Sequence, residues 1–384
     1  MKILMVSIFA PHFFNWAEQL KGSGHEIYWL DLYDSNTKVE KIDFINQIIG
    51  WRYRWNHPGR YFLKKNASQF TDIINRLNER DFEKVLERKV KEIEPDIIHS
   101  FVIYLGGEYV LPVIEKYPKI KWIVSSWGSD LYYYRNKKPY LEGIQRVLQK
   151  ADYLFTDCKR DHQIALDNGF NGKFLGAFPG GGGFDFRKTD PFMESFSERG
   201  LILIKGYQGL HGKCIEVLQA IEGLKDKLKL YKIVIFGNGE EVEAYVQKSE
   251  VKSWQNLELV GKIPPEEVMR LMGKAKIYIG NSTSDGMPNT LLEAIVMGAF
   301  PVQSNPGGVT AELIEDGFNG SLIENAQDIS KIKRTIIKTI SGEINIFKGV
   351  SYNLQEIKPR LERELIRQKV IEQYQLIEDQ NTQV

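Results

Sequence analysis

Two acidic residues, Asp285 and Glu293, stand on either side of a predicted helix start. Asp285 belongs to a polar loop, Pro288 stands where helices commonly begin, and Glu293 lies one turn inside the helix. The free N–H groups and the partial positive charge at a helix N-terminus bind anions. Carboxylates on either side can accept hydrogen bonds from hydroxyl groups. We therefore expect the stretch to bind a ligand that carries both phosphate and hydroxyl groups, as a phosphorylated sugar does.

The flanking sequence supplies the elements that must hold these two acids in place. An apolar strand ends at Gly280, the helix is stopped by Gly298, and a second strand follows at Phe300 to Gln303. A glycine-rich turn comes next, at Gly307 and Gly308. This strand–loop–helix–strand order is typical of a parallel sheet covered by helices.

The stretch from Tyr278 to Leu322 resembles the nucleotide-sugar signature of retaining glycosyltransferases of the family-four type, also called glycosyl transferases group 1. The resemblance implies the two-domain GT-B fold. It also implies that Asp285 contacts the donor sugar, where the family usually has Glu, and that Glu293 holds the ribose of the nucleotide. The alternative is a solvated loop acid and a solvated helix acid. The binding region implied by the resemblance also includes Gly286, Met287, Pro288, Asn289 and Thr290.

A second glycine-rich loop follows the predicted strand Leu201 to Ile204. It has the sequence KGYQGLHGKC and contains Lys205, Gly206 and Lys213. A strand, a glycine loop and a helix form an anion site, and nearby lysines would neutralise a diphosphate. The loop is not a Walker A motif, because Cys214 stands where Ser or Thr would bind magnesium. The resemblance implies that the leaving diphosphate is stabilised first by Lys213 and second by Lys205; the alternative is that both are surface lysines.

Two further glycine positions follow the next predicted strands. Gly237 and Gly239 follow Lys232 to Phe236 and match two thirds of a dinucleotide motif, but Val242 replaces the third glycine, so a nucleotide-sugar domain is favoured over NAD binding. The resemblance implies that the backbone of Gly261, Lys262 and Ile263 pairs with the nucleobase.

Length and composition limit the class of protein. The 384 residues suffice for about two domains, and the net charge of +1 gives no global basic field for nucleic acid. The two cysteines favour a reducing compartment. Because the apolar N-terminal run ends at Pro11 with no cleavage site, we interpret it as a buried strand rather than a signal peptide. No apolar run approaches the roughly 18 to 20 residues of a transmembrane helix, so a cytoplasmic protein, peripheral on the membrane at most, is expected.

The alternation of apolar runs and helical patterns predicts two Rossmann-like halves. The resemblance implies that they face each other across a cleft, as an acceptor-binding domain over residues 1–185 and a nucleotide-sugar-binding domain over 186–355. It also implies that residues 356–384, with a helical pattern in Gln355 to Gln380, form a C-terminal helix that crosses back to the first domain. Between the halves lies PGGGGFDF, Pro179 to Phe186, either a flexible linker or a turn at the cleft. The strands predicted besides those named above are Ile3 to Ile8, Glu26 to Leu30, Asp96 to Phe101, Trp122 to Ser125, Tyr153 to Thr156, Leu257 to Leu259 and Ile277 to Gly280.

The first half contributes three candidate regions. Trp127 to Asp130 follow a strand end, where ligands bind in open α/β sheets; Trp127 stands where the family commonly has His, and Asp130 either positions an acceptor hydroxyl or forms a turn. His12, in the loop after the first strand, is a weaker candidate. The segment Trp51 to Lys65 mixes aromatic and basic residues without an acid, as does Leu131 to Tyr140. Such a mixture favours anionic lipid headgroups, with an ordinary solvated insertion as the alternative.

The resemblance therefore implies a retaining glycosyltransferase with no cofactor beyond its nucleotide-diphosphate sugar, and the residues predict a metal-independent transfer. Neither an Asp-x-Asp pair nor a His/Cys cluster stands out, and no metal ligand is predicted. By the same resemblance, the expected acceptor is a glycan or a lipid-linked acceptor in bacterial surface polysaccharide or glycolipid synthesis. The alternative is a nucleotide-sugar-binding module without activity.

Overall fold

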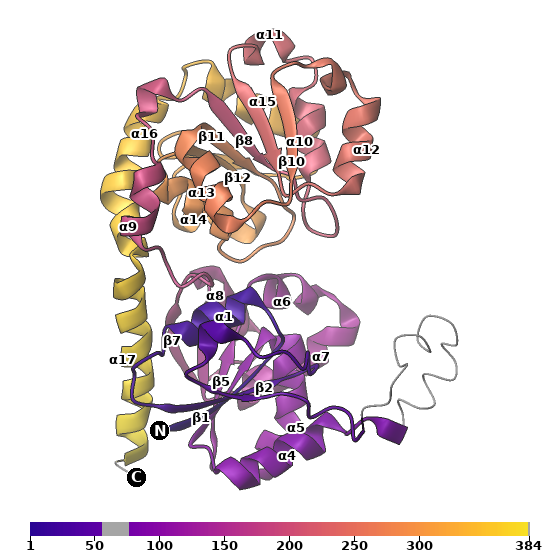
Figure 1. Ribbon diagram of the computed structural model, residues 1–384, viewed down its shortest axis with the longest axis vertical. Helices are drawn as coiled ribbons and strands as arrows, with labels where there is room; N and C mark the ends of the chain where they lie inside the picture. The colour runs from indigo at the N-terminus through magenta and orange to yellow at the C-terminus, as the bar shows by residue number, and fades with distance from the viewer. Residues whose placement is uncertain (56–76, 383–384) are drawn as a thin grey trace. The chain divides into compact units, whose positions relative to one another are not determined.

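The computed structural model describes residues 1–55 and 77–382, which fold into two compact units (Figure 1). The first unit contains Met1–Thr156, His162–Ala177 and the end of the chain from Val370. The second contains Asp157–Asp161 and Phe178–Lys369. The chain therefore changes unit after Ala177 rather than after residue 185, and it visits the second unit briefly at Asp157–Asp161.

Seven strands of the described residues form the parallel sheet of the first unit, in the order β3-β2-β1-β4-β5-β6-β7. Because β1 pairs with both β2 and β4, the order of the strands reverses beside β1. The central strands are short apolar runs buried on both faces, as expected of a parallel sheet between two layers of helices. The strands are β1 (Lys2–Ser7), β2 (Glu26–Asp31), β3 (Asn46–Ile48), β4 (Ile97–Phe101), β5 (Lys121–Ser125), β6 (Tyr153–Thr156) and β7 (Lys173–Ala177).

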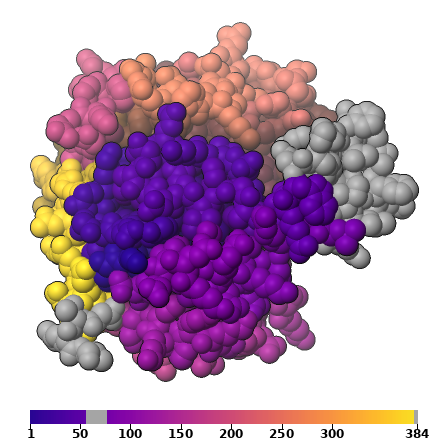
Figure 2. Space-filling model, turned by 60° about the horizontal axis from the view of Figure 1, so that its bottom comes forward, coloured from indigo at the N-terminus to yellow at the C-terminus, as the bar shows by residue number. Residues whose placement is uncertain are grey.

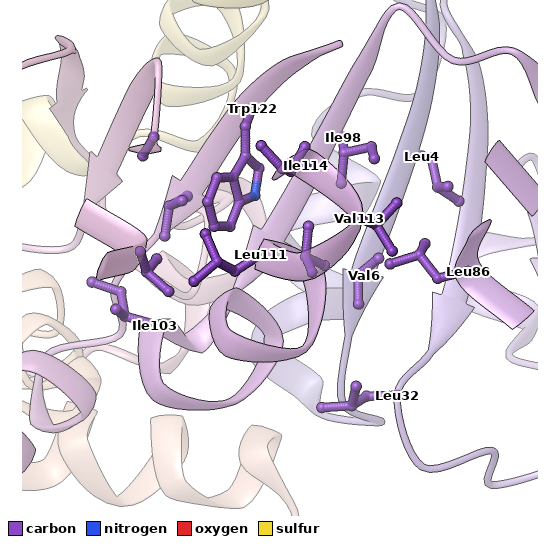
Figure 3. Packing of buried hydrophobic residues seen from close by; sticks show 14 of the residues in the cluster. Leu4, Val6, Leu32, Leu86, Ile98, Ile103, Leu111, Val113, Ile114 and Trp122 are labelled. Carbon is purple, nitrogen blue, oxygen red and sulfur yellow. The ribbon is translucent and has the colours of Figure 1, made fainter. Parts of the chain in front are cut away.

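One face of this sheet packs against α4, α5, α7 and α8. Side chains alternate along a strand, so Leu4 and Val6 of β1 face these helices while Ile3 and Met5 face the other way. Figure 3 shows Leu111 and Val113 of α5 close to the strands. The helices of the unit up to α8 are α1 (Pro11–Glu18), α4 (Phe82–Ile93), α5 (Glu108–Lys116), α6 (Ser129–Tyr132), α7 (Lys138–Lys150) and α8 (Lys159–Asp167).

The other face packs against α1 and the end of α17 (Arg363–Thr382). The α17 residues Val370, Tyr374 and Ile377 are fully buried, and the Tyr374 hydroxyl accepts a hydrogen bond from Trp16 Nε1 (3.1 Å) and bonds His99 Nδ1 (2.7 Å). Glu378 pairs with the N-terminal ammonium at 2.7 Å. In both views the yellow C-terminal part of the chain lies beside the indigo N-terminal part (Figures 1 and 2).

Six strands of the described residues form the parallel sheet of the second unit, in the order β10-β9-β8-β11-β12-β13. Here the order reverses at β8, which pairs with both β9 and β11. The strands are β8 (Leu201–Lys205), β9 (Lys232–Phe236), β10 (Leu257–Gly261), β11 (Ala275–Gly280), β12 (Phe300–Ser304) and β13 (Ser321–Ile323).

The two faces of this sheet have separate cores. Ile202 and Ile204 of β8 pack with α10, α12 and α15, whereas Leu201 and Leu203 pack with α13 and α14. The helices are α9 (Phe186–Thr189), α10 (Cys214–Ile221), α11 (Lys225–Leu228), α12 (Glu240–Lys248), α13 (Pro265–Lys274), α14 (Asn289–Val296), α15 (Ile329–Ile340) and α16 (Ile346–Tyr352).

The structure confirms the predicted α/β class with two Rossmann-like units, and ten predicted strands correspond to β1, β2, β4, β5, β6 and β8 to β12. The prediction missed β3, β7 and β13, which lie at sheet edges. The final helix begins at Arg363 rather than Gln355, because π-helical and 3₁₀ turns precede it. Among the described residues, no helix combines the length and apolar composition that crossing a bilayer requires.

Candidate nucleotide-sugar site

The predicted nucleotide-binding residues of the second unit gather at the carboxyl edge of its sheet. Lys205 ends β8, Gly237 follows β9, Gly261 ends β10, and Gly280 ends β11. The order of the strands reverses between β8 and β11, and ligands of open α/β sheets bind at such a reversal. The sheet therefore brings both predicted loops, which follow β8 and β11, to its expected binding edge.

The helix behind Asp285 begins where the sequence predicts. Helix α14 starts at Asn289, directly after Pro288, and is anchored by the buried side chains of Leu291 and Leu292. Glu293 lies in the second turn, and its Oε2 is buried with no hydrogen-bond partner among the residues that the structure describes. Burial raises the pKa of this carboxyl to about 7, opposed by the positive charge of Lys205. A buried, unpartnered carboxylate oxygen is suited to accept a hydrogen bond from a ligand.

Asp285 lies in the loop between β11 and α14 and is held through its backbone. Its carbonyl oxygen accepts a hydrogen bond of 2.8 Å from Arg160 Nη2. The loop also contacts His211, whose backbone oxygen accepts a 2.9 Å hydrogen bond from Thr283 N. Burial lowers the pKa of His211, and the negative charge of Asp285 acts in the opposite direction. The Asp285 carboxylate is therefore near enough to His211, in the loop that follows β8, to interact with it electrostatically.

The loop after β8 pairs with the Asp285 loop along its backbone. Lys213 N donates to the Asn281 oxygen at 3.0 Å, and Gly212 forms an antiparallel bridge with Ser282. Lys213 is half-buried, and its Nζ donates to the Gly209 oxygen within the same loop at 3.1 Å. Gly206 must be glycine, because a Cβ there would lie 2.8 Å from the backbone nitrogen of Asn238. Both predicted lysines are thus present at this edge, with the cation of Lys213 held within its own loop.

The turns after β9 and β10 are joined to each other. Gly237 N donates to the Gly261 oxygen at 2.6 Å, and Gly261 N donates to Asn238 Oδ1 at 2.9 Å. Both glycines have positive φ, 71° and 64°, and the space where a Cβ would stand is open. Lys262 is exposed and Ile263 is half-buried against the core. This open backbone is compatible with the predicted contact to a nucleobase.

The remaining residues of the predicted binding stretch are packed tightly. A Cβ on Gly286 would collide with the carboxylate of Asp157, so the residue must be glycine. Met287 belongs to the core, and the Thr290 hydroxyl accepts a 2.7 Å hydrogen bond from Tyr278. Asn289 reaches the glycine-rich segment, its Oδ1 lying 3.2 Å from the Cβ position of Gly181.

The segment Pro179 to Phe186 is folded onto the second unit. Phe184 N donates to the Leu361 oxygen at 2.9 Å, and Arg363 N donates to the Phe184 oxygen at 3.0 Å. Gly183, at φ +78°, leaves no room for a side chain, since its Cβ would meet Ile366 at 2.7 Å. The glycine-rich segment thus packs against residues 361–366 and approaches Asn289, which argues against a free linker. Its direct contact with a ligand stays a prediction.

The candidates of the first half lie in the other unit. Asp130 is buried, and its carboxylate accepts hydrogen bonds from Ser126 Oγ (3.0 Å), Trp127 N (2.8 Å) and Ile103 N (2.8 Å). These bonds hold the turn after β5, which is the turn-forming role left open by the sequence. The Trp127 ring lies 5.6 Å from that of His12. A contact of these residues with an acceptor stays a prediction.

A feature that the sequence analysis missed is the turn Asp157–Asp161 between β6 and α8. Asp157, Cys158 and Asp161 offer ligand atoms within 4.8 Å of one another, a spacing that would suit a metal ion. However, Asp161 is fully buried in an ion pair with Arg160 (2.7 Å), and burial raises the pKa of the Cys158 thiol. The guanidinium of Arg160 therefore already supplies positive charge to this cluster. No pattern in the sequence indicates this turn, because the residues that anchor it, Asp285, Pro306 and Glu312, are distant in the chain.

Solved structures share this fold over nearly the whole chain. The Anabaena HepE structure in complex with UDP and glucose aligns with a TM-score of 0.67 at 12% identity, over 98% of this chain and 99% of that one. A sucrose-phosphate synthase from Thermosynechococcus elongatus aligns with a TM-score of 0.73 at 13% identity, over the same shares of the two chains. The protein thus has the GT-B fold.

Sequence comparison matches part of the chain to a family. Residues 194–352, which contain both loops and Glu293, match the family described as "Glycosyl transferases group 1". This part of the chain is therefore similar to the family that its resemblance indicated.

Two named relatives are similar in sequence to this chain over part of their length. The "Putative teichuronic acid biosynthesis glycosyltransferase TuaC" of Bacillus subtilis is 24% identical over 58% of this chain and 56% of that protein. A Campylobacter jejuni alpha-1,4-N-acetyl-D-galactosaminyltransferase named for a diNAcBac-PP-undecaprenol-linked glycan is 28% identical over 43% of this chain and 45% of that protein. The chain thus spans about half the length of these relatives.

Proposed function

We propose that the protein is a glycosyltransferase that moves a sugar from a nucleotide-diphosphate sugar to a glycan or lipid-linked acceptor in bacterial surface polysaccharide or glycolipid synthesis. The observation that carries the proposal is the buried Oε2 of Glu293, which has no hydrogen-bond partner within the described part of the chain and lies near the helix N-terminus at Asn289. Hydroxyl groups would satisfy the carboxylate, and the N-terminus would accept phosphate. The UDP-glucose complex of HepE and the names of the relatives support the same substrate class.

The proposed chemistry is metal-independent and retains the anomeric configuration. An acceptor hydroxyl oxygen bonds to the sugar's anomeric carbon, the bond to the leaving phosphate breaks, and the hydroxyl proton passes to that phosphate. Lys213, with Lys205 second, stabilises the charge that develops on the leaving diphosphate. Asp285 contacts the donor sugar, and Glu293 holds the ribose. No cofactor beyond the donor takes part.

A binding panel tests this proposal. UDP-, GDP- and dTDP-sugars are titrated against the whole protein by calorimetry, and turnover is then measured with lipid-linked and free glycan acceptors. We expect saturable binding of at least one sugar nucleotide and release of its nucleoside diphosphate upon addition of an acceptor. Binding without turnover on any acceptor would favour a module without activity. Failure to bind any of these nucleotides would refute the proposal.

We also propose that the first unit docks on an anionic membrane on the cytoplasmic side. Of the predicted segment Trp51 to Lys65, residues 56–65 lie outside the described residues. Trp51 itself is buried and donates to the Asp31 oxygen at 2.8 Å, and Arg52 pairs with Glu79, so both serve the unit's own structure. Trp55 is exposed. The docking role therefore falls to the segment beyond Arg52.

The second aromatic and basic segment supports docking. The rings of Tyr104 and Tyr134 stack at 4.1 Å, and Lys137 Nζ lies 4.7 Å from the Tyr133 ring. Lys137 and Lys138 are exposed. Aromatic rings suit headgroup depth, and each cation near the surface contributes about 1 kcal/mol of binding.

Charge neutralisation should therefore weaken vesicle binding. In co-sedimentation with phosphatidylglycerol vesicles, we expect a several-fold loss when four basic residues beyond Arg52 and the two exposed lysines are changed to Gln. The matched control changes three exposed lysines of α11 and its flank in the second unit, and should leave binding unchanged. Equal binding by both variants would assign the segments to structure alone. The first set is Arg54, Arg60, Lys64, Lys65, Lys137 and Lys138, and the control set is Lys225, Lys227 and Lys229.

A further inference from the structure

The turn Asp157–Asp161 contains a buried arginine that is tied in several directions. The side chain of Arg160 is 9% exposed and that of its ion-pair partner Asp161 is 0% exposed. Arg160 Nε and Nη2 donate to Asp161 Oδ1 at 2.9 and 2.7 Å, Nη1 donates to the Pro306 oxygen at 2.7 Å, and Nη2 donates to the Asp285 oxygen at 2.8 Å. All these residues belong to the second unit.

The turn is itself anchored beyond the guanidinium. The backbone N–H groups of Lys159 and Arg160 both donate to the Glu312 carboxylate at 2.8 Å. Glu312 follows the glycine-rich turn that contains Pro306. Asp157 packs so closely on Gly286 that no side chain fits there. Two consecutive residues of the donor loop, Asp285 and Gly286, therefore rest on this turn.

The two predicted donor contacts depend on the turn to different degrees. Glu293 is held by α14, whose inner side chains Leu291, Leu292 and Ile295 are fully buried in the core. Asp285 lies in the loop before that helix, and its main chain is bonded directly to Arg160. A loss of the guanidinium should thus displace Asp285 while leaving Glu293 in place.

We infer that Arg160 is a positioning residue that sets the Asp285 carboxylate against the sugar of the donor, and so governs sugar recognition and transfer but not nucleotide binding. This inference rests on the proposed function. A planar guanidinium can hold Asp161 and two carbonyl oxygens at once, whereas a lysine ammonium lacks that fork. Small misplacements of a positioning group can cost about 100-fold in rate.

The test compares Arg160→Lys with a matched buried arginine, Arg199→Lys. Arg199 is 4% exposed and donates to the oxygens of Ala275, Met297 and Gly298, at the opposite end of β11 and α14 from the donor loop. Both changes should lower the melting temperature, because both remove hydrogen bonds from buried carbonyls. The two variants differ in which end of the same helix they loosen.

The readout is the affinity for a sugar nucleotide relative to that for its parent nucleoside diphosphate. The probes are UDP-glucose with UDP, GDP-mannose with GDP, and dTDP-glucose with dTDP, and the pair that the wild type binds best is used. For Arg160→Lys we expect nucleoside diphosphate affinity within about twofold of wild type, a ratio reduced about fivefold or more, and kcat reduced by about 100-fold. Arg199→Lys should leave the ratio unchanged.

Several outcomes would overturn the inference. Arg160→Lys behaving as Arg199→Lys does, with a lower melting temperature and an unchanged ratio, would make the residue purely structural. Should Arg160→Lys not fold, Glu312→Gln loosens the same turn while keeping the guanidinium, and an unchanged ratio in that variant would equally refute the inference. If the wild type binds none of the three pairs, the proposed function fails and this inference with it; if the wild type binds, only the inference is at stake.

Discussion

Replacing Lys213 by alanine is expected to lower kcat by about 100- to 1,000-fold, with a much smaller effect on nucleotide affinity. The cation lies in the loop after β8, whose backbone is fixed to the Asp285 loop through Lys213 N and the Asn281 oxygen. The charge on a leaving diphosphate grows as its bond to the sugar breaks, so a cation held nearby stabilises the transition state more than the ground state. Steady-state kinetics with the donor found by the binding panel measure the effect.

The control for Lys213→Ala is Lys331→Ala, which removes an exposed lysine of α15 that pairs with Glu324. It should leave both kcat and KM unchanged. The kcat of Lys205→Ala should lie between those of the two variants. Lys205 stands near Glu293 and is the second lysine predicted to stabilise the leaving diphosphate. Near-wild-type kinetics for Lys213→Ala would remove this residue from the catalytic machinery.

Replacing Glu293 by glutamine is expected to weaken binding of the sugar nucleotide by about 10- to 100-fold at pH 8. Hydrogen bonds to a charged group contribute about 1.5 to 3 kcal/mol, which corresponds to this range of affinity. The wild type should bind more tightly as the pH rises through about 7, because the carboxyl ionises there in the free protein. The variant should lose that dependence. Calorimetric titrations between about pH 5.5 and about pH 8.5 measure both effects.

The same substitution is expected to stabilise the fold at alkaline pH. The folded-state pKa of Glu293, about 7, lies above the ordinary value of 4.5 because of burial. Between those values the folded protein binds more protons than the unfolded chain, so this group's contribution to stability falls as the pH rises through the window. Glu293→Gln removes the free-energy cost of burying the ionised carboxylate, which is on the order of 3 kcal/mol above pH 7. Thermal melts should give the same melting temperature for wild type and variant at pH 4. At pH 8 the variant should have the higher melting temperature.

A lower melting temperature for Glu293→Gln at pH 8 would contradict this account of the buried carboxyl. Glu266→Gln, at an exposed position of α13, serves as the control, because its carboxylate pairs with Arg270 at the surface. It should change neither the affinity nor the melting temperature at either pH.

The sequence was sufficient for most of the fold because buried parallel strands are continuous apolar runs. Ile3 to Ile8 and Lys232 to Phe236 are of this kind, and both are strands in the structure. Edge strands lack that signal: β3 has the sequence NQI and no fully buried residue, and β7 is half-exposed. The helix start after Pro288 was predictable because local chemistry decides it.

Long-range partners could not be predicted. Arg160 stands in a stretch of ordinary polar residues, and only the folded chain brings it to Asp285 and Pro306. Trp51 illustrates the opposite error. Its setting among basic residues indicated a surface, yet its ring packs against Phe82 in the core. The composition of a segment is thus a poor guide to the burial of a single large side chain within it.

The division of α17 between the two units affects how the protein can be dissected. A fragment ending at Ala177 would lack Tyr374, and it would lose the hydrogen bonds that the Tyr374 hydroxyl makes with Trp16 Nε1 and with Nδ1 of the fully buried His99. The first unit is therefore assembled from both ends of the polypeptide. A single protease cut or gene truncation between the units cannot yield it intact. A circular permutant that begins at Val370 and links Val384 to Met1 would instead carry the whole first unit in one continuous stretch, interrupted only by Asp157–Asp161 of the second unit.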